Sequence, residues 1–369
     1  MESALHHRGV KVQPEVRNLF SRTYAEARQK FLQVAASRGL DVESHELPLE
    51  GAHGESLATD VVRDGPLHAS KLAVIISGVH GVEGYCGSAI QTGLLGLGPV
   101  AAPDTAVLYI HAVNPHGFSY SRRETQENVD LNRNFVDFSA PLPDNKPYAE
   151  IHELLLPTEW PPSDDNELAL FMLRKEWGVK GFQRAVSLGQ YRFEDGMHFG
   201  GREPAWSNTT FRRILQRHAR NCQHLGSIDV HTGLGPYGVG ERIFACLDEG
   251  RSLERARRWW GDVTSVHAGT SNSIPMTGPI QFALFDECAQ AEQTNLCLEF
   301  GTYPMPQVIG ASRAEHWLHR HGSSDPLQAA AIRQTLKDAF YPQADDWQQA
   351  VWQQGRDVFL RTLNGLRED

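Results

Sequence analysis

The sequence predicts an α/β protein in which helices cover both faces of a largely parallel sheet. Short apolar, β-branched segments such as Leu72–Ser77 and Thr105–Val113 read as buried strands, and they alternate with segments of helical spacing. The chain has 369 residues, of which 40% are hydrophobic and 22% charged, so it can bury a sizeable core. In such a sheet, functional loops follow the carboxyl ends of the parallel strands.

The first part of the chain is predicted to open with a helix over Pro14–Gly39. Apolar residues recur there at helical spacing, Pro14 suits a first turn and Gly39 suits the end. The elements expected next are, in order, strands at Val42–Leu47, Leu57–Arg63 and Leu72–Ser77, a helix at Cys86–Leu95, a strand at Thr105–Val113 and a turn at Asn114–Gly117.

The middle, about residues 140–206, is predicted to be an insertion of helices and loops over the sheet. Its helical patterns cover Glu150–Leu156 and Asn166–Trp177, with a third candidate at Gly181–Leu188. The loop Glu194–Gly201 either lines a pocket or is a surface connection, and the sequence favours neither.

After the insertion, strands and helices alternate again and the chain ends in helices. We expect strands at Leu225–Val230, Ile243–Leu247 and Asn295–Phe300, helices at Asn208–Asn221 and Ser252–Trp260, and a helical tail over about residues 305–369 with helices at Pro306–His321, Pro326–Phe340 and Asp345–Leu363. No repeat or linker divides the sequence, so we expect one domain over residues 1–369.

Composition and charge exclude several classes of protein. The net charge is −10 and no stripe of Lys and Arg is present, so we expect no nucleic-acid partner. Five scattered cysteines indicate free thiols in a reducing compartment. The segment Met1–Arg8 lacks the apolar core of a signal peptide, and no apolar stretch could span a bilayer. We expect a cytoplasmic protein without a membrane partner, and the oligomeric state is left open.

The predicted strand at Leu72–Ser77 leads into a glycine-rich loop that carries His80 and Glu83. An imidazole and a carboxylate three residues apart can reach one metal ion, and His₂Glu with an open position is a catalytic zinc set. Taken alone, the pair is better explained as an ordinary loop histidine beside a helix-capping glutamate. His231 repeats the arrangement, because it too ends a strand before glycine-rich turns. It lies 148 positions after Glu83. Together the three residues favour a metal site at neighbouring strand ends.

Between these motifs lies Asp130-Leu131-Asn132-Arg133-Asn134-Phe135. This motif, with His-x-x-Glu before it and a strand-end His after it, resembles the zinc carboxypeptidases of the carboxypeptidase A type. Ser77-Gly-Val-His-Gly-Val-Glu-Gly84 and His231-Thr-Gly-Leu-Gly-Pro-Tyr-Gly238 resemble a poorly characterised bacterial branch of that superfamily, related to the aspartoacylase and succinylglutamate desuccinylase group. The resemblance extends from about Leu72 to Thr302 and implies a carboxypeptidase-like fold with a mixed, largely parallel sheet and one catalytic domain.

The resemblance also implies roles for single residues. His80, Glu83 and His231 would hold one Zn²⁺ per chain. Asn132 and Arg133 would bind a substrate carboxylate. Arg123 would stabilise the oxyanion, with Arg122 as the competitor for that role. Asp130 would accept a hydrogen bond from the ring N–H of His80.

Glu299 interrupts the apolar pattern of the predicted strand Asn295–Phe300. A carboxylate buried there is either part of a structural ion pair or a catalytic group with an adjusted pKa. The resemblance implies the second, with Glu299 as general base and acid. The mobile tyrosine that carboxypeptidases close over their substrate has no equivalent that can be placed, since Tyr237 lies very close to His231 and no tyrosine lies between Tyr237 and Tyr303.

The expected function is therefore that of a zinc-dependent hydrolase, a metallocarboxypeptidase-like enzyme. Metal-activated water would cleave an amide bond next to a free carboxylate in a small peptide. A deacylase acting on N-acyl amino acids or small amides, of the aspartoacylase type, would use the same residues, so only substrates separate the two. A zinc-binding protein without turnover is the remote alternative, and it would need neither Glu299 nor Arg123.

Overall fold

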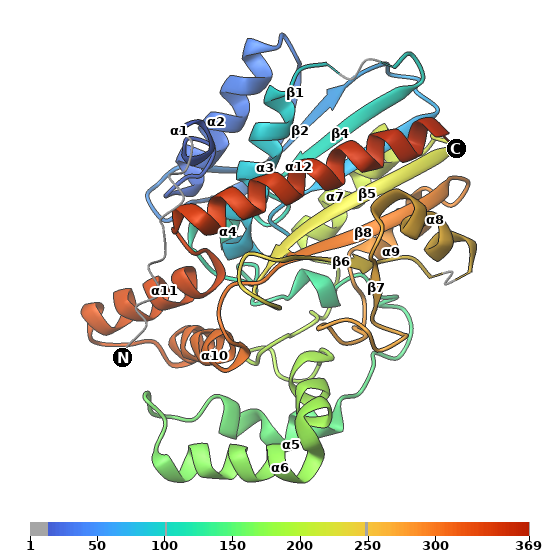
Figure 1. Cartoon of the computed structure of the whole chain (residues 1–369). Coiled ribbons are helices and arrows are strands. Elements are labelled where there is room, and N and C mark those ends of the chain that lie inside the picture. Colours follow the sequence, from blue (N-terminus) through green and yellow to red (C-terminus); the bar gives the residue numbers. More distant parts are fainter. Residues whose placement is uncertain (1–13, 100–101, 248–249, 369) are drawn as a thin grey trace, which may run out of the picture.

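The computed structural model describes residues 14–99, 102–247 and 250–368 (Figure 1). Its described part contains an eight-stranded sheet in the order β1-β2-β4-β3-β5-β8-β6-β7. The neighbours β4, β3, β5 and β8 run parallel, whereas the β1–β2, β2–β4 and β6–β8 pairs are antiparallel. The strands are β1 Val42–Glu50, β2 Ser56–Asp64, β3 Lys71–Ile76, β4 Thr105–His111, β5 His224–Thr232, β6 Gly240–Phe244, β7 Thr264–Ser265 and β8 Glu292–Phe300. The predicted class, α/β with a mixed and largely parallel sheet, is confirmed.

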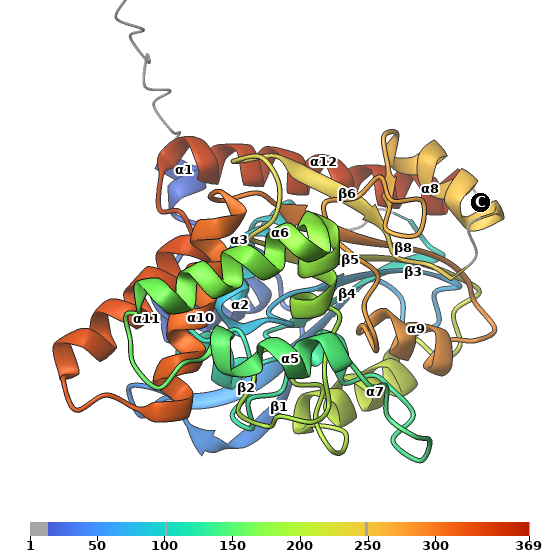
Figure 2. The ribbon, with the colours of Figure 1, turned by 90° about the horizontal axis from the view of Figure 1, so that it is seen from below.

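Helices lie on both faces of the sheet. The α-helices of the described residues are α1 Pro14–Arg17, α2 Tyr24–Ser37, α3 Gly84–Gly96, α4 Pro115–Ser119, α5 Lys146–Leu155, α6 Asp164–Ser187, α7 Trp206–His218, α8 Arg251–Trp260, α9 Gln281–Glu287, α10 Met305–His321, α11 Pro326–Phe340 and α12 Asp345–Glu368. Figure 2 shows α12 and α8 above the strands and α7 and α9 below them.

The strand β3 illustrates why two layers of helix are needed. Its side chains alternate between two cores: Ala73 and Ile75 pack in one, with α2, α3, α8 and α12, while Leu72, Val74 and Ile76 pack in the other, with α7 and α9. All five are fully buried. A parallel strand that is apolar on both faces is stable only when both faces are covered.

Several sequence-predicted boundaries were wrong. The helix expected over Pro14–Gly39 is two helices, α1 and α2, and the Thr23 side chain between them caps α2 by accepting a hydrogen bond from Glu26 N. The turn expected at Asn114–Gly117 begins the short helix α4, where the Asn114 side chain accepts a hydrogen bond from Gly117 N. In both places a capping side chain competes with the pattern of apolar residues.

The middle and the tail of the chain pack against each other. Buried residues of α5 and α6, such as Tyr148 and Leu170, share a core with Trp317 of α10 and Ile332 of α11. Gly178, with φ of +70°, interrupts α6 and separates the two helical patterns of the sequence. Figure 1 shows α5 and α6 beyond the end of the sheet where β5 and β8 finish. Among the residues described, no helix is long and apolar enough to cross a membrane.

Candidate metal centre and active site

The loop after β3 folds sharply so that His80 and Glu83 follow the strand directly. Gly78 adopts a φ of +67°, and a Cβ at Gly81 would lie 2.0 Å from the carbonyl carbon of Gly117, so only glycine fits there. The short 3₁₀ helix Gly81–Glu83 (η1) then leads into α3. Two backbone hydrogen bonds, Gly81 N to Arg123 O and Val82 N to Arg122 O, fix this loop to the arginine segment.

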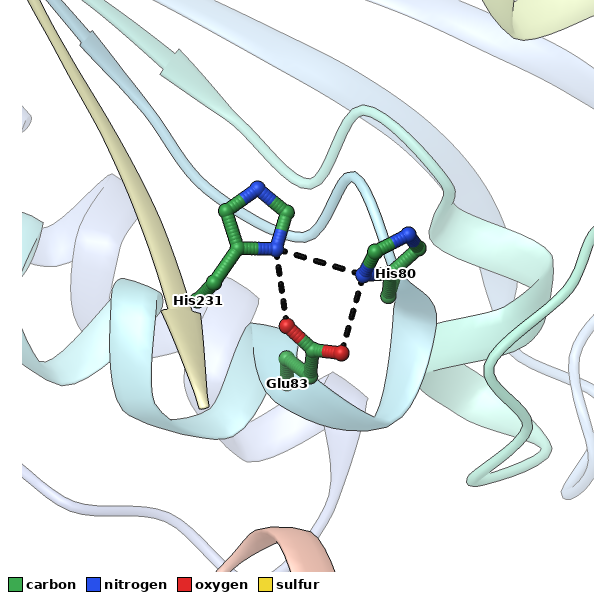
Figure 3. Close-up of side chains that lie close together, drawn as sticks. All are labelled: His80, Glu83 and His231. Carbon is green, nitrogen blue, oxygen red and sulfur yellow. Dashed lines mark hydrogen bonds and ion pairs between the residues drawn. The ribbon is translucent and has the colours of Figure 1, made fainter. Parts of the chain in front are cut away.

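His80, Glu83 and His231 converge at the carboxyl ends of β3 and β5 (Figure 3). The two oxygens of Glu83 lie 2.9 Å from His80 Nδ1 and 2.8 Å from His231 Nδ1, and the two Nδ1 atoms are 3.2 Å apart. All three side chains are buried, and their ligand atoms lie within 4.8 Å of one another. The structure thus brings together the three residues expected to bind metal.

Carboxylates behind the two imidazoles determine where their protons sit. His80 Nε2 lies 3.1 Å from Asp130 Oδ1, and His231 Nε2 lies 2.8 Å from Asp229 Oδ2. Because an ionised carboxylate can only accept, each Nε2 is a donor, and each Nδ1 faces Glu83 and the other imidazole. Without a metal ion, a proton on Nδ1 pairs with the Glu83 carboxylate; a bound cation would replace that proton and take the Nδ1 lone pairs. The residues therefore fit a metal ion.

The electrostatics of this group are consistent with a cation-binding site. Burial disfavours a charged Glu83, but His80 and His231 hold the pKa of its carboxyl well below the ordinary value. Burial would likewise lower the pKa of His231, but Asp229 and Glu83 raise it well above the ordinary value. The site therefore attracts positive charge. Asp229 was missed from the sequence, although an acid inside the apolar strand Leu225–Val230 is the same signal that singled out Glu299.

Glu299 lies beside this group because β8 is the next strand. His231 and Glu299 are register partners on β5 and β8, and both line the same cavity. Glu299 Oε1 accepts a hydrogen bond of 3.0 Å from Leu234 N. Burial, with the Glu83 charge in second place, raises the pKa of the Glu299 carboxyl to about 8. A carboxyl with such a pKa can accept and return a proton near neutral pH.

The structure shows which of the two candidate arginines, Arg122 or Arg123, reaches the cavity. Arg122 points away from the cavity and pairs with Glu315, at 2.6 Å, and with Asn128, at 2.9 Å. Arg123 lines the cavity and donates to Glu83 Oε1 at 3.1 Å and to Asp130 Oδ2 at 3.0 Å. Arg123 is therefore the one of the two that a bound substrate can reach.

Arg133 and Asn132 also line the cavity. The Arg133 guanidinium is buried, its Nη2 donates to Ser187 O at the end of α6 (2.5 Å), and its Nε has no hydrogen-bond partner among the described residues. Gly189 allows this packing, since a Cβ there would lie 2.6 Å from Arg133 Cδ. Asn132 places its amide nitrogen 3.5 Å from His231 Nε2. The Arg133 Nε packs against Gly189 and is sealed from solvent, so a bound anion would meet the Nη1 edge of the guanidinium, beside Met276 of the cavity lining.

The cavity above these groups has a volume of about 130 Å³ and a largely apolar wall. Its apolar lining comes from segments far apart in the sequence: Val186, Met197, Leu234, Ile274, Met276, Met305, Val308, Ile309 and Phe340. The loop Glu194–Gly201 lines the pocket through Met197 and His198, which resolves the alternative left open above. Tyr237 is not in the lining; its side chain is 44% exposed and bonds Asp346 at 3.2 Å.

A second buried cluster supports the arginine segment from behind. Glu124 Oε1 lies 3.2 Å from His316 Nε2 of α10, and both side chains are almost fully buried. Although burial opposes ionisation, His316 lowers the pKa of Glu124 from 4.5 to about 2. Glu124 also lies 3.7 Å from Arg123 Nε. This cluster connects α10, part of the cavity wall, to the segment that carries Arg123.

Replacing Glu124 with Gln is expected to lower the free energy of unfolding by about 3 kcal/mol at pH 7, since one partner of a buried ion pair is lost. The pKa of Glu124 is lower in the folded state, so its ionised form stabilises the fold above pH 4.5 and loses that effect as the pH falls toward 2. The difference in the free energy of unfolding between the wild type and Glu124→Gln should therefore become smaller below pH 4.5. Denaturant unfolding at several pH values measures it.

The matched control for this substitution is Glu153→Gln. Glu153 pairs with Arg320 on the surface and is 69% exposed, so its loss should change stability by less than about 1 kcal/mol. The ion-pair interpretation would be contradicted if Glu124→Gln lost no more unfolding free energy than Glu153→Gln, or if its loss did not depend on pH.

Comparison with known proteins gives a family but no recorded activity. A family model described as "Protein of unknown function (DUF2817)" matches residues 20–354. No curated protein matches the chain.

Solved structures that are similar to the chain share little sequence with it. A candidate metallopeptidase from Shewanella denitrificans OS217 is 13% identical, with a TM-score of 0.39 over 81% of this chain and 91% of that one. Bovine thrombin-activatable fibrinolysis inhibitor, solved with a tick carboxypeptidase inhibitor, is 12% identical, with a TM-score of 0.44 over 87% of this chain and 99% of that one. The succinylglutamate desuccinylase from Chromobacterium violaceum is 13% identical, with a TM-score of 0.37 over 85% and 73%.

Proposed function

We propose that this chain, which belongs to the DUF2817 family, is a zinc-dependent hydrolase of amide bonds that lie next to a free carboxylate. The description of the family names no activity. The observation that carries the proposal is the pair of facing Nδ1 atoms of His80 and His231, 3.2 Å apart and closed on one side by Glu83. Three protein ligands of this kind leave a coordination position open, which is typical of catalytic zinc.

The residues of the cavity supply what such a reaction needs around the ion. His80, Glu83 and His231 would hold Zn²⁺, which when bound polarises a carbonyl and lowers the pKa of water. Glu299 takes the proton from the attacking water and returns it to the leaving amine, because its carboxyl lines the cavity beside the ligand His231. Arg123 donates hydrogen bonds to the carbonyl oxygen as negative charge develops there.

Arg133 and Asn132, which line the same cavity, bind the substrate carboxylate. Hydrogen bonds to Asn132 O and Ser187 O fix the plane of the Arg133 guanidinium, which supplies a charged donor group for the carboxylate. The apolar lining excludes water from the remaining space and strengthens these charged hydrogen bonds.

A deacylase acting on N-acyl amino acids is the second candidate, and the cavity wall favours it. The wall is formed by Met276, Met305 and Ile309, which are suited to an apolar acyl group. Both candidates require the same carboxylate and the same ion.

A mass-spectrometric turnover panel distinguishes the two candidates. The protein, loaded with zinc, is offered N-blocked dipeptides, longer peptides and N-acyl amino acids, each with and without a chelator. We expect hydrolysis that the chelator abolishes and zinc restores. Release of C-terminal residues would establish a peptidase, and cleavage of N-acyl amino acids alone a deacylase. Failure to hydrolyse any carboxylate-bearing amide would count against the proposal.

Replacing Arg133 with Met is expected to lower kcat/KM about 50-fold for substrates with a free carboxylate, mainly by raising KM, because a charged hydrogen bond is lost. Matched carboxamide substrates should be hydrolysed equally by both proteins. Steady-state kinetics on the two substrate series, with zinc content measured in parallel, checks this. Equal losses on carboxylate and carboxamide substrates would place the effect of Arg133 elsewhere.

A further inference from the structure

His198 lines the cavity but has no part in the chemistry proposed so far. Its φ is +52°, a left-handed conformation that is strained for a residue with a Cβ. Hydrogen bonds fix the backbone around it: Met197 N donates to the Tyr148 hydroxyl at 2.7 Å, and Gln190 N donates to His198 O at 3.1 Å. The loop thus holds the imidazole in one place against its local preference.

The hydrogen-bonding state of the His198 ring follows from Asp130. His198 Nδ1 lies 3.0 Å from Asp130 Oδ2 and must donate to it, so a neutral ring keeps a lone pair on Nε2. No described residue bonds to this Nε2, and it is not among the polar atoms sealed from solvent. Burial lowers the pKa of His198 to about 4; the bond to Asp130 opposes this shift, and Arg133 and Arg123 reinforce it, so the ring is neutral at pH 7. The cavity therefore contains an accessible hydrogen-bond acceptor.

The His198 ring shares a carboxylate with both arginines of the proposed site. The oxygen that accepts from His198 Nδ1, Asp130 Oδ2, also accepts from Arg123 Nη2 at 3.0 Å and lies 3.6 Å from Arg133 Nη1. The side chains of His198, Arg123 and Arg133 line the same cavity. In the proposed substrate, the amide nitrogen is one bond from the carbonyl carbon and two bonds from the carboxylate carbon. A substrate held by Arg123 and Arg133 therefore has its amide N–H between the groups that the two arginines bind, in the cavity that His198 lines.

We propose that His198 is a specificity residue whose Nε2 accepts a hydrogen bond from the N–H of the amide to be cleaved. The inference rests on the proposed function, because it uses the same cavity and the same substrate orientation. It restricts the substrates to secondary amides. An ester has no N–H, and an N-alkylated amide places a methyl group against the lone pair, so both lose this contact.

Three probes with one apolar side chain test the proposal: N-acetyl-leucine, N-acetyl-N-methyl-leucine and the O-acetyl ester of 2-hydroxy-4-methylpentanoic acid. Replacing His198 with Phe keeps a ring but removes both nitrogens. We expect kcat/KM for N-acetyl-leucine to fall about tenfold further than for the ester, which is the usual effect of one hydrogen bond. Replacing His198 with Gln, whose Oε1 can occupy the position of Nε2, should recover most of the kcat/KM for N-acetyl-leucine that His198→Phe loses.

A structural role of His198 predicts a different pattern. Loss of its bond to Asp130 would disturb Arg123 and the metal ligand His80 for every substrate, so the amide and ester rates would fall by the same factor and zinc content would drop. Equal losses on amide and ester, or no loss at all, would overturn the proposal.

A binding measurement separates this inference from the proposed function. If the wild-type protein hydrolyses none of the probes, the proposed function fails, yet calorimetry on N-acetyl-leucine and its N-methyl analogue still tests His198. Tighter binding of the N–H compound by the wild type, lost in His198→Phe, would support the acceptor role. Equal binding of the two compounds, or binding of neither, would overturn it.

Discussion

Replacing Glu299 with Gln is expected to lower kcat about a thousandfold while the protein keeps its zinc. The substitution preserves the shape of the side chain and the acceptor for Leu234 N, but it removes the group that takes up and returns the proton. General acid–base catalysis typically contributes factors of about 10² to 10⁴. Single-turnover kinetics with the best substrate of the panel, together with metal analysis by mass spectrometry, gives both quantities.

Glu241→Gln is the matched control for this substitution. Glu241 is the register partner of Glu299 on β6, but it bonds Thr264 and Asn272 and does not line the cavity. Its replacement should leave kcat within about twofold. Retained turnover in Glu299→Gln would refute the role of Glu299 as base. Loss of zinc in that variant would show that Glu299 acts on the metal site and would leave proton transfer to another group.

Replacing His231 with Ala is expected to weaken zinc binding by more than about a hundredfold and to abolish hydrolysis. One of three ligands disappears, and the remaining His80 and Glu83 cannot hold the ion in place. Competition with a chromophoric chelator measures the affinity. Added zinc at high concentration should restore little activity, because the geometry around the ion is lost along with the affinity.

His111→Gln is the control for a buried histidine at a strand end. His111 ends β4, the neighbour of β3, but it bonds Ser88 at 2.8 Å and stacks on Phe31. Its loss should lower stability and leave zinc binding unchanged. If His111→Gln and His231→Ala lose zinc equally, the loss comes from general destabilisation, and the assignment of His231 as a ligand fails.

The strands that carry the candidate site residues could be predicted from the sequence. The strands that became β3, β5 and β8 are short apolar runs, and their ends carry His80, His231 and Glu299 next to glycines. Parallel strands finish at one edge of a sheet, so residues at these three ends had to lie near one another once the strands were neighbours. Their places at strand ends marked His80, Glu83 and His231 as candidates, and the family resemblance implied that they bind metal.

Other features depend on contacts that the pattern of apolar residues does not record. The break between α1 and α2 follows from the cap at Thr23. The choice between Arg122 and Arg123 depends on Glu315, 193 positions away from Arg122, which binds one arginine and leaves the other to the cavity. Periodicity describes one element at a time and cannot express which distant carboxylate a side chain meets.

The sequence by itself determined the α/β class and the three residues that converge as a candidate metal centre, because hydrophobic period and glycine placement are local properties. Only the tertiary structure decided which nitrogen of each histidine faces the centre, since Asp130 and Asp229 set the tautomers from outside the motif. The same is true of His198, whose ring meets Asp130 across 68 positions of sequence. Proton positions and cavity walls arise from side chains that meet only when the chain is folded.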